Sequence, residues 1–181
     1  MKKTLIILLC LPMIGFGQDL AIGNTYQGGI IFYLDEDGGG LIAAPSDQSS
    51  KTQWGCWASN YNNFTGADQE GIGTGRQNTI DILDRCLQIS AAYWCDDYTK
   101  ISNGITYDDW FLPSKDELNE IYLNIGQGSS LGNVGGFADN IYYWSSTEVG
   151  NGEVWGQSFV RGGQYKFGKF VNNGVRAIRV F

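Results

Sequence analysis

The sequence predicts an α+β fold: an antiparallel sheet with paired terminal strands, two flanking helices and long glycine-rich loops. β-Branched and aromatic runs separated by glycine-bearing turns occur near both ends of the chain. Between them lie two segments with the apolar spacing of amphipathic helices. The 181 residues include 26 glycines and are 14% aromatic, and their mean hydropathy is −0.20. This composition and length are typical of one folded domain with a core.

The chain begins with a charged, then apolar, then small-residue pattern. Lys2 and Lys3 precede an apolar run, and Gly15 and Gly17 follow it. A secretory signal peptide has this pattern, so we expect residues 1–18 to be a signal and residues 19–181 to form one domain that is secreted, periplasmic or at the cell surface. A membrane anchor is the alternative, but the run is shorter than the roughly 20 residues that span a bilayer. No later stretch is apolar enough to span, so no transmembrane segment is expected after cleavage.

Residues 28–44 predict a β-hairpin, because two apolar runs flank an acidic, glycine-rich turn. A calcium loop is the alternative, since Asp35 and Asp37 have suitable spacing. However, Gly39 and Ser46 stand where an oxygen ligand and a bidentate glutamate belong. The plain hairpin is therefore favoured.

Residues 45–77 are polar and glycine-rich and predict a long loop. Within it, residues 71–75 read Gly-Ile-Gly-Thr-Gly, which suggests a phosphate-binding loop. Arg76 stands in place of the third glycine of the dinucleotide pattern, no strand is predicted before it, and no lysine completes a P-loop. A glycine-rich connection into a helix is the favoured interpretation.

Two helices are expected in the middle of the chain. Thr79 can cap the first, with Ile80, Leu83 and Leu87 on one face, and the pattern continues to Cys95. The second follows Pro113 and is marked more clearly, because Ser114 and Glu117 have the spacing of a capping box and Gly126 follows the last apolar residue.

From Ile141 onward the pattern is one of strands and glycine-bearing turns. Strands are expected at residues 154–160, 165–171 and 175–181, which predicts an antiparallel meander. The final strand is expected to pair within a sheet, most simply beside the first strand.

Three cysteines follow the predicted signal. Export makes a disulfide feasible, and the favoured pairing is Cys56 with Cys86, with Cys95 a buried thiol. Such a link closes a loop of about 30 residues and contributes around 3–4 kcal/mol. Three unpaired cysteines are the alternative.

Charge is distributed unevenly. Without Lys2 and Lys3, 10 basic residues face 19 acidic ones, a net charge of −9, which argues against nucleic acid as a partner. After Glu153 there is no acidic residue, and the basic residues of this last stretch are Arg161, Lys166, Lys169, Arg176 and Arg179. The C-terminal end is thus a basic region on an acidic body.

The chain contains no histidine, which excludes imidazole triads and histidine-ligated zinc sites. A carboxylate pair remains feasible for a glycoside hydrolase, but no spacing distinguishes one. The candidate pairs are Asp96 with Asp97, Asp108 with Asp109, and Glu148 with Glu153. We therefore expect no enzyme activity, no metal and no cofactor.

Binding is the better supported expectation, because the chain has six tryptophans and ten tyrosines, residues that stack on sugars or anchor protein partners. Trp110 and Trp144 are expected in the core. Aromatic and basic residues gather with turns in residues 149–174, so the predicted ligand contacts are Trp155, Arg161, Tyr165, Lys166 and Lys169. The expected partner is a glycan or an extracellular protein.

Three blocks of sequence resemble the Lcl C-terminal domain family, which is named for the terminal domain of a bacterial collagen-like adhesin. They are residues 71–79, residues 109–118 (Asp-Trp-Phe-Leu-Pro-Ser-Lys-Asp-Glu-Leu) and residues 143–148 (Tyr-Trp-Ser-Ser-Thr-Glu), followed by Val-Arg-Ala-Ile-Arg at 175–179. The resemblance covers nearly all of the chain after the predicted signal.

The resemblance implies a C-type-lectin-like fold and a secreted or surface adhesion module, in a family whose named adhesin recognises sulfated glycans. This chain departs from it in lacking a collagen-like stalk, and its net negative charge opposes binding of polyanions except at the basic C-terminal end. The Glu-Pro-Asn calcium motif of lectins is absent, so calcium-dependent sugar binding is not implied.

Overall fold

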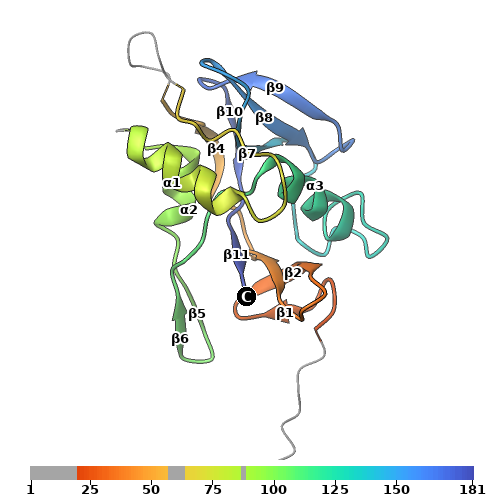
Figure 1. The fold of residues 1–181 in the computed structure, drawn as a ribbon. Coiled ribbons are helices and arrows are strands. Elements are labelled where there is room, and N and C mark those ends of the chain that lie inside the picture. Colours follow the sequence, from red (N-terminus) through yellow and green to blue (C-terminus); the bar gives the residue numbers. More distant parts are fainter. Residues whose placement is uncertain (1–19, 57–63, 87–88) are drawn as a thin grey trace, which may run out of the picture.

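The computed structural model describes residues 20–56, 64–86 and 89–181. The predicted signal peptide lies outside these residues. The fold is α+β, as predicted, with two larger sheets, a separate hairpin and three helices among the described residues (Figure 1). The helices are α1 (Gly75–Arg85), α2 (Ala91–Asp96) and α3 (Lys115–Asn124).

The smaller sheet brings the two ends of the described chain together. Its strand order is β1-β2-β3-β11, and all of its pairs are antiparallel. The strands are β1 (Thr25–Tyr26), β2 (Gly29–Leu34), β3 (Gly40–Ala43) and β11 (Ile178–Val180). The last strand, β11, was expected beside the first strand, and this prediction is wrong. β11 pairs instead with β3, which lies between β2 and β11.

The larger sheet has the order β4-β10-β7-β8-β9. Only β7–β8 and β8–β9 follow the predicted meander, because β10 crosses to the far side of β7, pairs with it in parallel and pairs with β4 in antiparallel. The single strand expected at 175–181 is divided between β10 and β11. The strands are β4 (Ser49–Gln53), β7 (Tyr142–Glu148), β8 (Glu153–Ser158), β9 (Gln164–Gly168) and β10 (Asn172–Val175).

The predicted first helix is wrong in both its start and its length. α1 begins at Gly75, so Thr79 is an interior residue and not the N-cap. Its hydroxyl donates to the Gly75 carbonyl at 2.8 Å. Ile80 faces outward, while Asn78, Thr79 and Ile82 are buried. A new helix, α2, begins after Ser90, whose side chain accepts from the Tyr93 amide at 3.1 Å.

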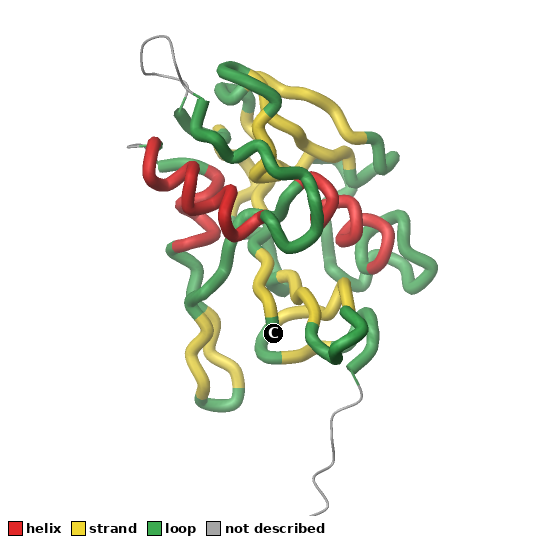
Figure 2. Tube along the Cα trace, in the orientation of Figure 1, coloured by secondary structure: helices red, strands yellow, loops and turns green. Residues whose placement is uncertain are grey.

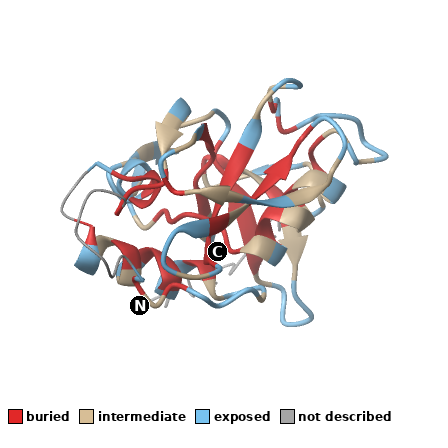
Figure 3. Ribbon diagram, turned by 90° about the horizontal axis from the view of Figure 1, so that it is seen from above, coloured by how far each residue is buried: buried red, intermediate tan, exposed pale blue. Residues whose placement is uncertain are grey.

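The helices cover opposite faces of the larger sheet (Figure 2). α1 and α2 contact β7, whereas α3 packs between β2 and the strands β7 and β8. Since neighbouring residues of a strand point to opposite faces, Trp144 joins the core beneath α1 and α2, and Tyr143 joins the core beside α3. Trp110 and Trp144 are buried as expected, and exposed residues are gathered on the loops and turns (Figure 3).

Two local predictions are confirmed. Residues 28–44 form a hairpin, in whose turn the Asp35 carboxylate accepts the amides of Asp37 and Gly39 at 3.0 and 2.8 Å. α3 has the predicted capping box, in which Ser114 and Glu117 bond each other's backbone amides. The hairpin of β5 (Lys100–Ser102) and β6 (Ile105–Tyr107) was not predicted and projects from the body in Figure 1.

Candidate functional site

The five predicted ligand contacts do not form one surface. In the register of β8 and β9, Trp155 lies opposite Lys166 and Gly156 lies opposite Tyr165. Paired residues share a face and adjacent residues do not, so Trp155 and Lys166 lie on the α3 face of the sheet while Tyr165 lies on the other face. The sheet itself therefore divides the predicted patch.

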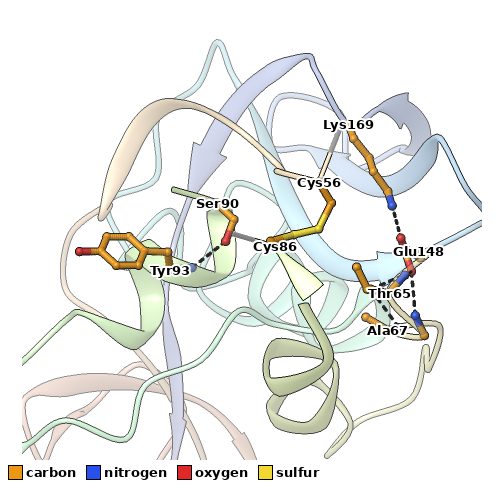
Figure 4. The surroundings of a disulfide bond; sticks show 9 residues. Cys56, Thr65, Ala67, Cys86, Ser90, Tyr93, Glu148 and Lys169 are labelled. Carbon is orange, nitrogen blue, oxygen red and sulfur yellow. Dashed lines mark hydrogen bonds and ion pairs between the residues drawn. A yellow bond between two sulfur atoms is a disulfide. The ribbon is translucent and has the colours of Figure 1, made fainter. Parts of the chain in front are cut away.

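Lys169 is wrong as an outward contact, because its side chain is 1% exposed. Its ammonium group forms an ion pair with the Glu148 carboxylate (Figure 4) and lies 4.8 Å from the centre of the Trp54 ring. Burial lowers the pKa of the Lys169 ammonium, and the hydrogen bond with Glu148 opposes that shift. Lys169 thus neutralises an internal carboxylate instead of facing a ligand.

Glu148 is bonded on its other oxygen as well. Its Oε2 accepts the amide and the hydroxyl of Thr65, both at 2.8 Å, and the Gly66 amide at 3.2 Å. Cys56 is bonded to Cys86, as predicted (Figure 4). The disulfide therefore anchors Cys56 to the end of α1, and Glu148 anchors Thr65 and Gly66 to the end of β7.

Cys95 is a free, fully buried thiol, also as predicted. Burial, and secondarily the nearby Asp96 carboxylate, raises the pKa of the Cys95 thiol well above its usual value. Because the thiolate is the reactive form of cysteine, Cys95 is an inert core residue.

On the α3 face, Trp155 is half-buried and lies close to two ammonium groups. The Lys115 and Lys166 nitrogens lie 4.6 and 5.3 Å from the ring centre. Lys115 also forms an ion pair of 2.6 Å with Glu70. Much of the Trp155 ring is thus already in contact with protein groups, which leaves it a poor platform for stacking a sugar.

The opposite face carries a pocket that we call the tyrosine pocket. Tyr142 and Tyr165, which are 40% and 49% exposed, meet edge to face with 6.0 Å between ring centres. The pocket has a volume of about 310 Å³. It is lined by Asn140, Ile141, Tyr142, Ser158, Val160, Arg161 and Tyr165. Two of the five predicted contacts, Arg161 and Tyr165, are therefore brought together.

The chemistry of the tyrosine pocket is that of a binding site for a polar ligand with an apolar face. Tyrosine rings supply flat apolar surface with a polar hydroxyl. The Arg161 side chain is exposed and forms no ion pair with any described residue. Arg161, Asn140 and Ser158 can donate hydrogen bonds to ligand oxygens.

Sequence reasoning missed the Tyr142 side of this pocket. The signal for it was present, because Tyr142 lies two residues before the buried Trp144 and so shares its face of β7. At the end of the strand that face emerges into solvent. The parts contributed by residues 140 and 158 depend on strand pairing, which a local pattern does not specify.

In two of the three candidate carboxylate pairs, the two members lie in different environments. Asp109 forms ion pairs with Arg76 and Arg179, whereas Asp108 is exposed. Glu148 is buried and Glu153 is exposed. Asp96 and Asp97 are both exposed.

The glycine-rich segment at residues 71–75 leads into α1, as expected, and serves the fold. The Glu117 carboxylate accepts the Gly73 amide at 2.8 Å and the Ser114 amide at 2.7 Å. A Cβ atom at Gly75 would meet a Glu117 oxygen at 2.3 Å. Glycine is therefore required at Gly75 because the carboxylate that joins the starts of α1 and α3 lies against it.

No family model matches this chain, and no curated protein is significantly similar to it. None of the helices in the described part of the chain has the length and apolar character needed to cross a membrane.

Proposed function

We propose that this protein is a secreted or surface-exposed recognition module that binds a glycan through the tyrosine pocket. The observation that carries the proposal is the exposed Tyr142–Tyr165 pair beside the unpaired Arg161. Aromatic rings cover the apolar faces of sugars, while arginine, asparagine and serine groups bond their oxygens. The Cys56–Cys86 disulfide supports residence outside a reducing cytoplasm.

The resemblance to the Lcl C-terminal domain family supports the same function. The C-type-lectin-like plan that it implies is supported by a sheet that contains the first and last strands of the described chain, by flanking helices and by long loops. Recognition of an anionic glycan at this pocket depends on Arg161, because Lys169 and Arg176 are buried. Of the other late basic residues, Arg179 pairs with Asp109, and Lys166 lies on the opposite face of the sheet. No carboxylate lines the tyrosine pocket, so the proposal includes no hydrolysis.

A glycan array tests the proposal. The wild-type protein and Tyr165→Ala are applied at two salt concentrations, with Phe170→Ala as the control because Phe170 is 63% exposed and lines no part of the pocket. We expect Tyr165→Ala to lose binding that Phe170→Ala retains. Binding that is equal in both variants, or binding to no glycan at all, would contradict it.

A second candidate is a structural subunit of a cell-surface assembly. The observation that favours it is the projecting β5–β6 hairpin, on which Ile101 and Ile105 are 68% and 55% exposed. Exposed apolar side chains are found at sites where a protein partner binds. Isolation of a stoichiometric complex that Ile101→Ser abolishes would favour this candidate over glycan binding.

A further inference from the structure

A second pocket lies between the end of α2 and the segment that follows β3, and we call it the Trp94 pocket. Its volume is about 290 Å³, near the roughly 300 Å³ lower limit of small-ligand sites. It is lined by Ser46, Asp47, Gln48, Trp94, Asp97, Tyr98 and Thr99. A volume of this size limits the occupant to a group such as a single sugar ring.

The pocket carries one uncompensated negative charge. Asp47 is engaged, because its carboxylate pairs with Arg176 at 2.7 Å and accepts the Tyr143 hydroxyl at 2.8 Å. Asp97 is exposed, and its carboxylate forms no hydrogen bond or ion pair with any described residue. The Asp97 carboxylate is therefore available to a cationic ligand.

The aromatic wall of the pocket is also available. Among the described residues, the buried tryptophans Trp54, Trp110 and Trp144 each donate their indole N–H group to a backbone carbonyl. Trp94 is 36% exposed, and within the described chain its indole N–H donates to no protein acceptor. An indole face beside a carboxylate is suited to an ammonium group, which both attract.

We propose that the Trp94 pocket binds an amino sugar that carries a free ammonium group. The Asp97 carboxylate accepts from the ammonium, and Trp94 covers the apolar face of the ring. The hydroxyls of Ser46 and Thr99, which bond no described side chain or backbone group, pair with the sugar hydroxyls. These hydroxyls favour a sugar over an aliphatic amine such as a lysine side chain.

The charge of the whole chain acts in the same direction. The net charge is −7, and an acidic body raises the local concentration of cations at its surface. The Trp94 pocket is formed by the end of α2, the residues that follow it and the segment after β3. The tyrosine pocket is formed by the start of β7, the end of β8, the turn that follows it and β9. The proposal is thus independent of glycan binding at the tyrosine pocket.

Titration of the full chain with glucosamine, followed by calorimetry, tests the proposal. N-acetylglucosamine and glucose are the matched neutral sugars, and lysine amide is the matched amine without a ring. We expect glucosamine to bind at least about tenfold more tightly than each of these, as a hydrogen-bonded charge pair requires. Equal affinity for glucose or for lysine amide would overturn it.

Two neighbouring variants locate the site. Asp97→Asn should remove most of the preference for glucosamine, whereas Asp96→Asn, which removes the same charge one residue away, should retain it because Asp96 does not line the pocket. Tyr165→Ala should bind glucosamine like the wild type. A preference for glucosamine that persists in Asp97→Asn would contradict the assignment of the site to the Trp94 pocket. This result does not depend on whether the tyrosine pocket binds a glycan.

Discussion

Tyr165 and Lys166 are adjacent in β9, yet their side chains lie on opposite faces of the five-stranded sheet. Tyr165 meets Tyr142 at the tyrosine pocket, while Lys166 lies 5.3 Å from the Trp155 ring on the α3 face. A ligand in the tyrosine pocket therefore contacts one of these neighbours and not the other. This relationship separates residues that the sequence places together.

Substitutions in β9 test that separation. Tyr165→Ala should weaken binding of a glycan ligand by about tenfold or more, because the aromatic contact with the ligand is lost. A tenfold change in affinity corresponds to about 1.4 kcal/mol of binding free energy. Lys166→Ala should change the affinity by less than about threefold at moderate salt, since the lysine lies on the other face. Fluorescence titration of both variants checks this, and equal losses would show that the two side chains share one site.

The buried ion pair of Lys169 and Glu148 gives a prediction about stability. Lys169→Met should lower the free energy of unfolding by about 3–5 kcal/mol, because it leaves the Glu148 carboxylate buried without its partner. The double variant Glu148→Gln, Lys169→Met should lose less than the sum of the two single variants. Urea denaturation measures all three.

The matched control for that experiment is Lys166→Met, which removes an exposed lysine three residues earlier. It should alter the free energy of unfolding by no more than about 0.5 kcal/mol. If Lys169→Met were equally mild, the ammonium group would be solvated in solution and the internal pairing would be wrong.

Reduction of the Cys56–Cys86 disulfide should destabilise the protein by about 3–4 kcal/mol, since the bond closes a loop between residues 30 positions apart. Denaturation of the double variant Cys56→Ser, Cys86→Ser measures this without a reductant. Cys95→Ser is the control for removal of a thiol from the core. A double variant as stable as the wild type would mean that the bond does not form.

Cys95 should resist alkylation in the folded protein. The thiol is fully buried, so the reagent does not reach it, and its raised pKa keeps it in the unreactive protonated form at pH 8. Treatment with iodoacetamide followed by peptide mapping should find Cys95 unmodified in native protein and modified after unfolding in urea. Rapid labelling of Cys95 in the native state would show that its surroundings open.

The sequence predicted those parts of the fold whose causes are local. The α3 capping box requires Ser114 and Glu117 three residues apart, and the first hairpin requires two apolar runs around one turn. The pairing of Cys56 with Cys86 was also favoured from sequence and is confirmed. The capping box and the hairpin each depend on a few neighbouring residues. The disulfide pairing depends on a choice among only three cysteines after the predicted signal.

The parts that sequence did not predict depend on contacts between distant segments. β10 pairs with β4 and β7 instead of continuing the meander, and no local pattern specifies that crossover. Lys169 is buried because Glu148, which is 21 residues earlier, lies beneath it. A basic residue in a turn-rich segment is exposed by default, and only the tertiary partner reverses that expectation.

The most direct test of the proposed function is amide NMR of the full chain with a glycan selected on the array. We expect the chemical-shift changes to concentrate in residues 140–142, 158–161 and 165, and we expect Lys166→Ala to leave them unchanged. Changes centred on Trp155 and Lys115, or none in the tyrosine pocket at saturating glycan, would contradict it.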